Sequence, residues 1–169
     1  MANRNTQGFG LIAQGTVGST MASQGQGKYL IDAGMGVDLF QGTAVRSAAG
    51  YIVTAQAAIT NTCIGVLNGI FYNDASTKKP TFANFYNQPI TPANSEDITA
   101  FVIDNPNQLF VASIDAAAAQ AEYGKTYSFS AAVPTGSEIS GQCSNTLDYT
   151  NSCLLYTSPS PRDGLLSRI

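Results

Sequence analysis

Apolar positions in the first half of the chain recur in short alternating runs, at the spacing of strands. The clearest runs are KYLIDAG at 28–34, the segments 43–46 and 51–54 around a turn at 48–50, and CIGVLNGIFYND at 63–74. Alternation with β-branched and aromatic residues, bounded by glycine and polar residues, predicts strands. Within the last run Gly69 predicts a bend or bulge, because an internal glycine weakens regular strand pairing.

The second half continues this pattern. A polar loop at 74–80 carries Lys78 and Lys79 at its expected exposed tip, and the aromatic-rich segment TFANFYNQP follows at 81–89. ITAFVI at 98–103 and LFVASI at 109–114 flank DNPNQ, which predicts a β-hairpin because Asp, Asn and Pro favour turns. Further strands are expected in two later segments, 126–133 and 140–150.

One stretch favours a helix instead. DAAAAQAEYGK at 115–125 is rich in alanine, the strongest helix former. Asp115 is a plausible N-cap and Gly124 a plausible C-terminal stop. We therefore expect one short helix at about 115–122.

These elements predict a single small all-β barrel or sandwich of about seven short strands, occupying residues 27–152. The strands are rich in alanine and glycine, so they pack closely but fix their register weakly. Identical neighbours would cover the exposed strand edges.

Residues 1–26 lack a persistent period and are rich in Gly, Gln, Ser and Thr. They predict a flexible N-terminal arm that becomes ordered only against a partner. Three apolar residues favour docking over a merely flexible terminus: Phe9, Leu11 and Ile12.

The last 17 residues, 153–169, differ in composition from everything before them. DNA that encodes CLLYTSPSPRD looks like a transposase-adapter oligonucleotide from sequencing libraries, read in one frame. Residues 153–169 are therefore expected to be a non-native, adapter-derived tail, with the natural frame continuing past Ser152. The alternative is an ordinary C-terminal tail in which Pro159 and Pro161 interrupt secondary structure.

Charge is sparse, since charged residues make up 11% of the chain against about 25% in typical domains. Excluding the tail removes two Arg and one Asp, which changes the formal charge from −3 to −4. The remaining basic residues are scattered, which argues against direct nucleic-acid binding. The chain has no run of about 20 apolar residues, so the sequence predicts no membrane-spanning helix. A surface of amides and hydroxyls suits permanent assembly, because little charge is desolvated on contact.

Residue types also limit the chemistry. The chain has no His, which removes the usual general base, the Ser-His-Asp triad and the common zinc ligand sets. No phosphate-binding glycine motif is present, and the acidic residues are spread thinly. We expect no enzymatic activity, no cofactor, no metal and no small-molecule substrate. Cys63 and Cys143 are expected to be buried free thiols, with one disulfide as the alternative.

Several segments together resemble virion structural proteins of uncultured marine tailed phages. They are GFGLIAQGTVGST, GQGKYLIDAG, LFQGTAV, GYI, IGVLNGIFYN and KKPTFANFYNQ. The order GYIVTA, IGVLNG and DNPNQLFVASID is also similar to small capsid decoration (cement) proteins. The resemblance implies a small β-domain, commonly a trimer, docked on the major capsid protein lattice and located in the virion.

The first functional hypothesis is therefore a structural protein that stabilises a capsid through surface burial across several subunits. Its candidate interface residues are Phe9, Leu11, Ile12, Phe82, Phe85 and Tyr86. Core packing is the alternative for the last three, and exposure of the rings distinguishes the two.

The second hypothesis is a tail or fibre module that binds a host-surface glycan. Four tyrosines could line such a site: Tyr51, Tyr72, Tyr86 and Tyr123. The absence of Trp and of a carboxylate cluster argues against this hypothesis.

Overall fold

The computed structural model describes residues 8–17, 25–55, 62–117, 120, 125, 127–131 and 133–149. The described residues confirm the all-β class and include ten strands, compared with the seven or so expected. In chain order they are β1 (Leu11–Thr16), β2 (Gln26–Ile31), β3 (Ala44–Ala48), β4 (Tyr51–Thr54), β5 (Gly65–Asn73), β6 (Pro80–Ala83), β7 (Ile98–Ile103), β8 (Gln108–Ala112), β9 (Ser128–Phe129) and β10 (Leu147–Asp148). A 3-10 turn, η1 (Ala93–Ser95), precedes β7.

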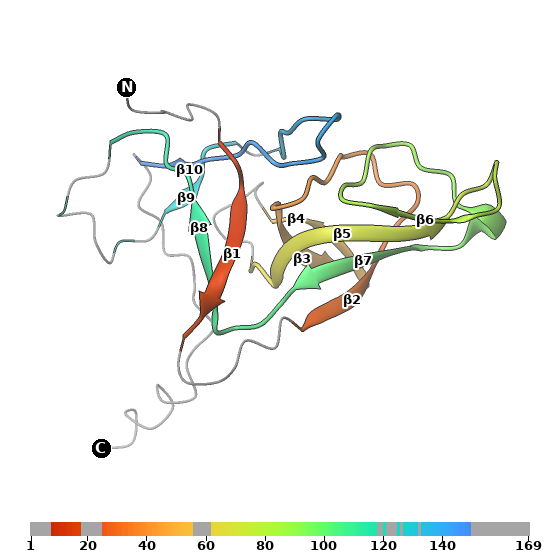
Figure 1. Ribbon diagram of the computed structural model, residues 1–169, viewed down its shortest axis with the longest axis horizontal. Helices are drawn as coiled ribbons and strands as arrows, with labels where there is room; N and C mark the ends of the chain where they lie inside the picture. Colours follow the sequence, from red (N-terminus) through yellow and green to blue (C-terminus); the bar gives the residue numbers. More distant parts are fainter. Residues whose placement is uncertain are drawn as a thin grey trace, which may run out of the picture.

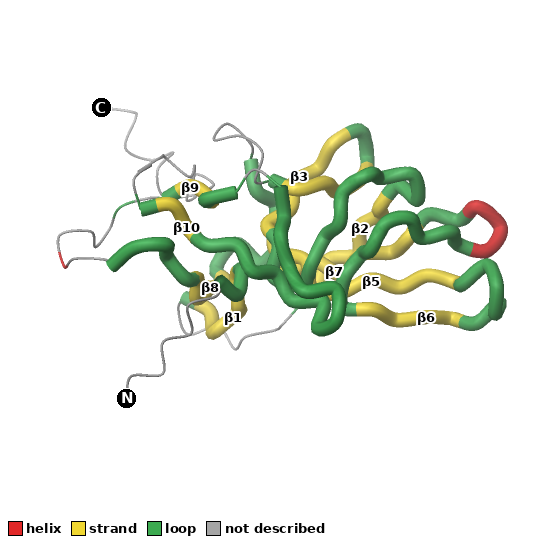
Figure 2. Tube along the Cα trace, turned by 90° about the horizontal axis from the view of Figure 1, so that it is seen from above, coloured by secondary structure: helices red, strands yellow, loops and turns green. Residues whose placement is uncertain are grey.

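A six-stranded antiparallel sheet forms one half of the molecule, in the order β2-β7-β5-β3-β4, with β6 paired to part of β5. Two small sheets, β1-β8 and β10-β9, form the other half (Figures 1 and 2). The large sheet curls, so that its outer strands β2 and β4 approach each other without pairing. The architecture is therefore sandwich-like, and it is not a closed barrel.

Local sequence signals account for the shape of the large sheet. Ala49 and Gly50 both have positive φ, 52° and 88°, in the tight turn that joins β3 to β4. Between Leu67 and Gly69 the pairing of β5 with β7 shifts register, which confirms the predicted bulge. The loop after β5 has Lys78 and Lys79 exposed, as expected.

The predicted hairpin at 98–114 is wrong, although both of its strands form. β7 is flanked by β2 on one side and β5 on the other, so no edge of β7 remains for β8. β8 pairs with β1 instead, in a separate sheet. The turn residues thus redirect the chain from one sheet to another.

The hydrophobic core lies on the concave face of the large sheet. Ile31, Ile70 and Ile98 are fully buried there, together with residues that enter from connecting segments. One of these is Tyr86, whose hydroxyl donates to the carbonyl oxygens of Met35 (3.0 Å) and Ala33 (3.3 Å). Such bonds satisfy the hydroxyl of a ring that is otherwise buried among apolar groups.

The expected N-terminal arm needs correction for residues 8–17. Leu11–Thr16 pairs with β8 of the same chain, and Leu11 N–H also donates to Gly42 O at 2.9 Å. The apolar residues of this segment therefore find a partner strand within the chain. Residues 1–7 and 18–24 of the predicted arm lie outside the described residues.

Half of the expected helix at 115–122, residues 118, 119, 121 and 122, also falls outside the described residues. Where it should begin, residues 115–117 are not helical. The Asp115 carboxylate accepts a hydrogen bond from Tyr149 N–H at 2.9 Å, and Asp115 N–H donates to Leu147 O. Asp115 therefore bonds the β10 region and does not cap a helix. The predicted tail, residues 153–169, is likewise outside the described part.

Candidate functional site

The convex face of the large sheet carries a row of residues that crosses four strands. In register, Leu30 of β2 lies opposite Thr99 of β7, Thr99 lies opposite Phe71 of β5, and Phe71 lies opposite Phe82 of β6. Directly paired residues project to the same face of a sheet. Phe82 is 73% exposed and Leu30 is 43% exposed, so the row ends in two large apolar side chains that face solvent.

Aromatic rings from three strands gather at one end of this row. The centroids of Phe71 and Phe82 lie 4.7 Å apart, and those of Phe82 and Phe101 lie 6.1 Å apart with an interplanar angle of 18°. We call Leu30, Phe71, Phe82 and Phe101 the convex patch. Lys28 lies opposite Phe101 and is exposed, which places one charge beside the patch.

The candidate interface residues from the aromatic loop fall into three environments. Phe82 is exposed, as an interface residue should be in an isolated chain. Phe85 is half-buried and stacks on Phe40 at a centroid distance of 5.7 Å. Tyr86 is completely buried, so its assignment to the interface is wrong and the alternative of core packing holds.

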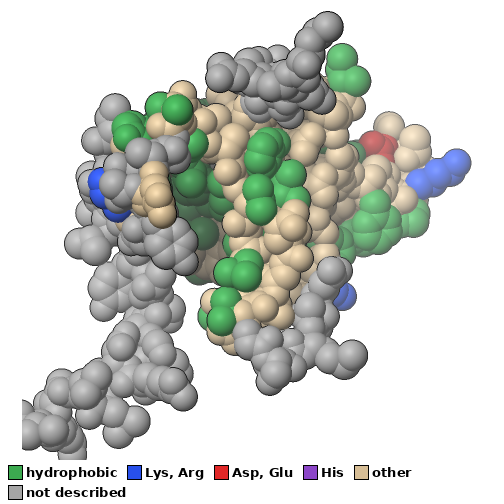
Figure 3. All heavy atoms as spheres, turned by 60° about the vertical axis from the view of Figure 1, so that its left-hand side comes forward, with side chains coloured by type: hydrophobic (Ala, Val, Ile, Leu, Met, Phe, Trp, Pro, Cys, Tyr) green, Lys and Arg blue, Asp and Glu red, His purple; other side chains and the backbone are tan. Residues whose placement is uncertain are grey.

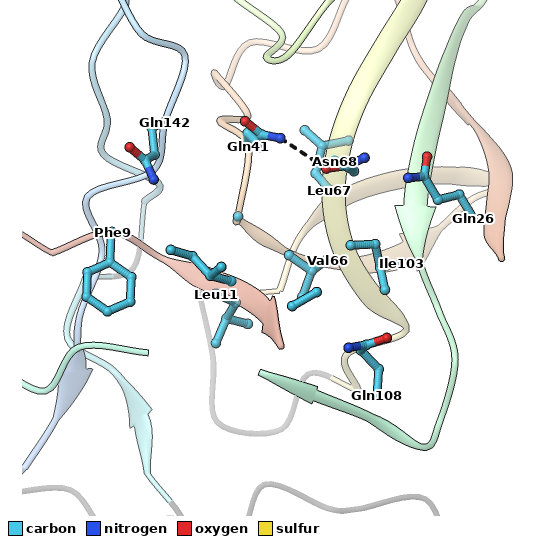
Figure 4. A pocket seen from close by; sticks show the side chains of 13 residues that line it. Phe9, Leu11, Gln26, Gln41, Val66, Leu67, Asn68, Ile103, Gln108 and Gln142 are labelled. Atoms are coloured by element: carbon cyan, nitrogen blue, oxygen red, sulfur yellow. Dashed lines mark hydrogen bonds between the residues drawn. The ribbon is translucent and has the colours of Figure 1, made fainter. Parts of the chain in front are cut away.

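The other three candidates lie together, away from the convex patch. Phe9, Leu11 and Ile12 line a cleft of about 340 Å³ between β1 and the end of the large sheet (Figure 4). Val66 and Ile103 contribute apolar side chains from the opposite wall. This volume falls within the range of about 300–1,000 Å³ that is typical of ligand pockets.

Side-chain amides surround the apolar part of this cleft. Gln41 Nε2 donates to Asn68 Oδ1 at 3.0 Å, and Gln108 Nε2 donates to Gly15 O at 2.7 Å. Gln26 and Gln142 are exposed at the rim. None of the residues that line the cleft is charged. We call this feature the amide cleft.

The surroundings of the cleft are also weakly charged. Figure 3 shows a face on which hydrophobic and uncharged side chains predominate, with hydrophobic groups in a hollow between its two halves. Long-range electrostatic attraction therefore contributes little to recognition on this face.

The titratable groups with displaced pKa values lie outside the cleft. The pKa of Asp74 is lowered to about 2, mainly by the Ser76 hydroxyl and then by the N–H groups of Thr77 and Ser76. The pKa of Tyr29 is raised, mainly by its hydrogen bond to Asp104 at 2.9 Å. Both arrangements stabilise local structure, the first a loop and the second a link between β2 and the segment after β7.

Both described cysteines are free thiols, as expected, but only Cys143 is fully buried and Cys63 is half-buried. Burial raises the pKa of the thiol at Cys63 and at Cys143. A buried, protonated thiol is a poor nucleophile, so neither residue is a good candidate for covalent chemistry. Among the described residues, no three His, Cys, Asp or Glu side chains gather as metal ligands.

The structure does not place the four tyrosines proposed for glycan binding in one exposed site. Tyr86 is buried in the core and Tyr123 lies outside the described residues. Tyr51 donates to Asp97 at 3.4 Å.

Within the part of the chain that is described, no helix has the length and apolar character to cross a bilayer.

Sequence reasoning missed most of the convex patch and the whole amide rim. Phe101 and Ile103 make ITAFVI apolar on both faces, which was a signal that the outward face of this strand is also covered or used. The glutamines gave no comparable signal, because they are separated in sequence and converge only through the fold.

Comparisons of the chain with protein families, with curated proteins and with solved structures gave no match.

Proposed function

We propose that this protein is a non-enzymatic structural subunit that acts by burying its convex patch against a neighbouring protein. The observation that carries the proposal is Phe82, which is 73% exposed at the end of a register row crossing four strands. Large exposed aromatic side chains in an apolar patch are typical interface anchors.

The assembly we propose is a phage capsid, with the protein as a decoration subunit on the major capsid protein lattice. The sequence resemblance described above supports this partner. The low charge of the chain supports it as well, because uncharged polar surface is desolvated at small cost in a permanent contact. Oligomerisation, as the trimer that the resemblance implies, would multiply weak contacts into stable attachment.

Mass spectrometry of purified phage particles tests the location. Trypsin releases YLIDAGMGVDLFQGTAVR, residues 29–46, because Lys28 and Arg46 are the flanking cleavage sites. We expect this peptide in density-purified particles and in the same fractions as major capsid protein peptides. A peptide found only in the soluble fraction of infected cells would contradict the proposal.

Binding to empty capsids from the same particles tests the surface. We expect Phe82→Ser to weaken binding on the order of tenfold, since buried aromatic anchors contribute several kcal/mol at most and about 1.4 kcal/mol gives tenfold. Ile139→Ser is the matched control, because Ile139 is 99% exposed and lies outside the convex patch. Equal loss in both variants would show that the patch has no special role.

A further inference from the structure

The edge of β1 that faces the amide cleft offers one free backbone N–H group, at Ala13. Leu11 N–H donates to Gly42 O at 2.9 Å and therefore points away from β8. Alternate residues of an antiparallel strand direct their N–H and C=O groups to the same edge. Ala13 lies two residues after Leu11 and is still in regular register, opposite Phe110. Its N–H group therefore also points away from β8.

Ala13 lines the amide cleft and is exposed. Alternation directs its N–H group away from β8, and no backbone hydrogen bond outside the strand ladders involves this group among the described residues. An unpaired strand edge is a ready template for an added strand, because main-chain hydrogen bonds can be completed by another chain. The cleft thus combines a free edge with an enclosed apolar wall.

The side-chain amides around the cleft indicate which kind of ligand it can bind. A side-chain amide has the same donor and acceptor groups as a peptide bond, so it can pair with a main chain in either direction. The hydrogen bond from Gln41 to Asn68 leaves the other half of each amide available. Since no charged side chain lines the cleft, a charged ligand would lose hydration without gaining a counter-charge.

We propose that the amide cleft binds an extended, uncharged polypeptide segment, which adds to the free edge of β1 at Ala13. Apolar side chains at every second position of the segment pack against Leu11, Val66 and Ile103, since alternate residues of a strand share one face. Gln26 and Gln142 at the rim pair with its main chain. The inference does not depend on the convex patch, because none of the four residues of that patch lines the cleft, although Gln26 and Asn68 border both surfaces.

Selection from a displayed library of random short peptides on the immobilised full chain tests the proposal. We expect enrichment of peptides with an uncharged core and apolar residues at alternate positions. Ala13→Pro removes the edge N–H and should weaken the selected peptides about tenfold, the upper range for one net hydrogen bond. Ala117→Pro is the matched control, since Ala117 is exposed and lies outside the cleft.

A second variant keeps the test valid if Ala13→Pro fails to fold. Gln26→Glu combined with Gln142→Glu places negative charge at two exposed rim positions. This variant should select peptides that carry Lys or Arg, a change that a purely structural role would not produce.

Three results would overturn the proposal. They are a lack of enrichment on the wild-type chain, enrichment of charged peptides on the wild-type chain, and unchanged selection by the double Glu variant. Stabilisation by maltohexaose without any peptide enrichment would identify a saccharide cleft and would also overturn it.

Discussion

At the residue scale, Gly27 makes room for the hydrogen bond between Tyr29 and Asp104. A Cβ at position 27 would meet Asp104 Oδ2 and would lie 2.6 Å from Tyr29 Cε2. We expect Gly27→Ala to separate this pair and to lower the free energy of unfolding by about 1–2 kcal/mol. Urea denaturation measures the loss, and Gly15→Ala is the control, because nothing lies within 4 Å of a Cβ at Gly15.

We expect Gly27→Ala also to change the titration of the Tyr29 hydroxyl. The hydrogen bond to Asp104 raises the pKa of Tyr29 above its ordinary value of 10.0. A raised pKa contributes stability that is present below pH 10 and is lost as the pH rises through the folded-state value. Absorbance titration of Gly27→Ala should show Tyr29 ionising closer to pH 10. An unchanged titration would contradict the role assigned to this pair.

For Asp74 we expect the opposite pH dependence, a loss of stability in acid. Its carboxylate accepts hydrogen bonds from the N–H groups of Ser76 and Thr77, each at 2.8 Å, and its pKa falls from 3.8 to about 2. A lowered pKa contributes stability above about pH 4 that is lost as the pH falls towards 2. Carbon-detected NMR titration should give a value near 2, and Asp74→Asn should abolish the part of acid destabilisation that arises in this window. A measured pKa near 3.8 would refute the loop geometry.

At the element scale, β7 and β8 follow each other in sequence but do not pair. β7 and β8 belong to different sheets, so they are expected to open independently. Val111 of β8 lies opposite Ile12 of β1. Because Leu11 N–H points away from β8, the next residue, Ile12, points towards β8 and exchanges backbone hydrogen bonds with Val111. Val111→Pro removes one of these bonds.

Hydrogen exchange measures the consequence of that change. Loss of a bond worth about 1 kcal/mol should speed exchange of β1 amides about fivefold. Amides of β5 and β7 should keep their protection, because their pairing does not involve β8. Uniform acceleration throughout the chain would show that the sheets unfold as one unit.

Sequence reasoning was most successful for single strands and for local turns. Alternation located β7, and Gly69 marked the bulge in β5, because both signals lie within a few residues. The hairpin prediction failed because a turn sequence permits a reversal without selecting the strand that occupies the neighbouring edge. That choice was decided by β2 and β5, which are distant in sequence from β8.

At the scale of the whole molecule, the two faces of the large sheet should respond differently to substitution. Leu67 is 1% exposed in the core, whereas Phe82 is 73% exposed on the convex patch. We expect Leu67→Ala to reduce the free energy of unfolding by about 2–5 kcal/mol, because it leaves a cavity. Phe82→Ser should change it by less than about 1 kcal/mol, since most surface substitutions have small effects. Thermal unfolding of both variants checks the contrast, and a large loss in Phe82→Ser would place this ring in the fold instead of an interface.

The sequence by itself determined the all-β class, the positions of most large-sheet strands and the bulge at Gly69. Those features follow from local periodicity, turn chemistry and the chemistry of individual residues. Only the tertiary structure decided that Tyr86 is core, that Phe82 is surface, and that separated glutamines meet at one cleft. These outcomes depend on which strand edges pair and on how far the sheet curls. Both are set by contacts between distant segments, which residue periodicity does not encode.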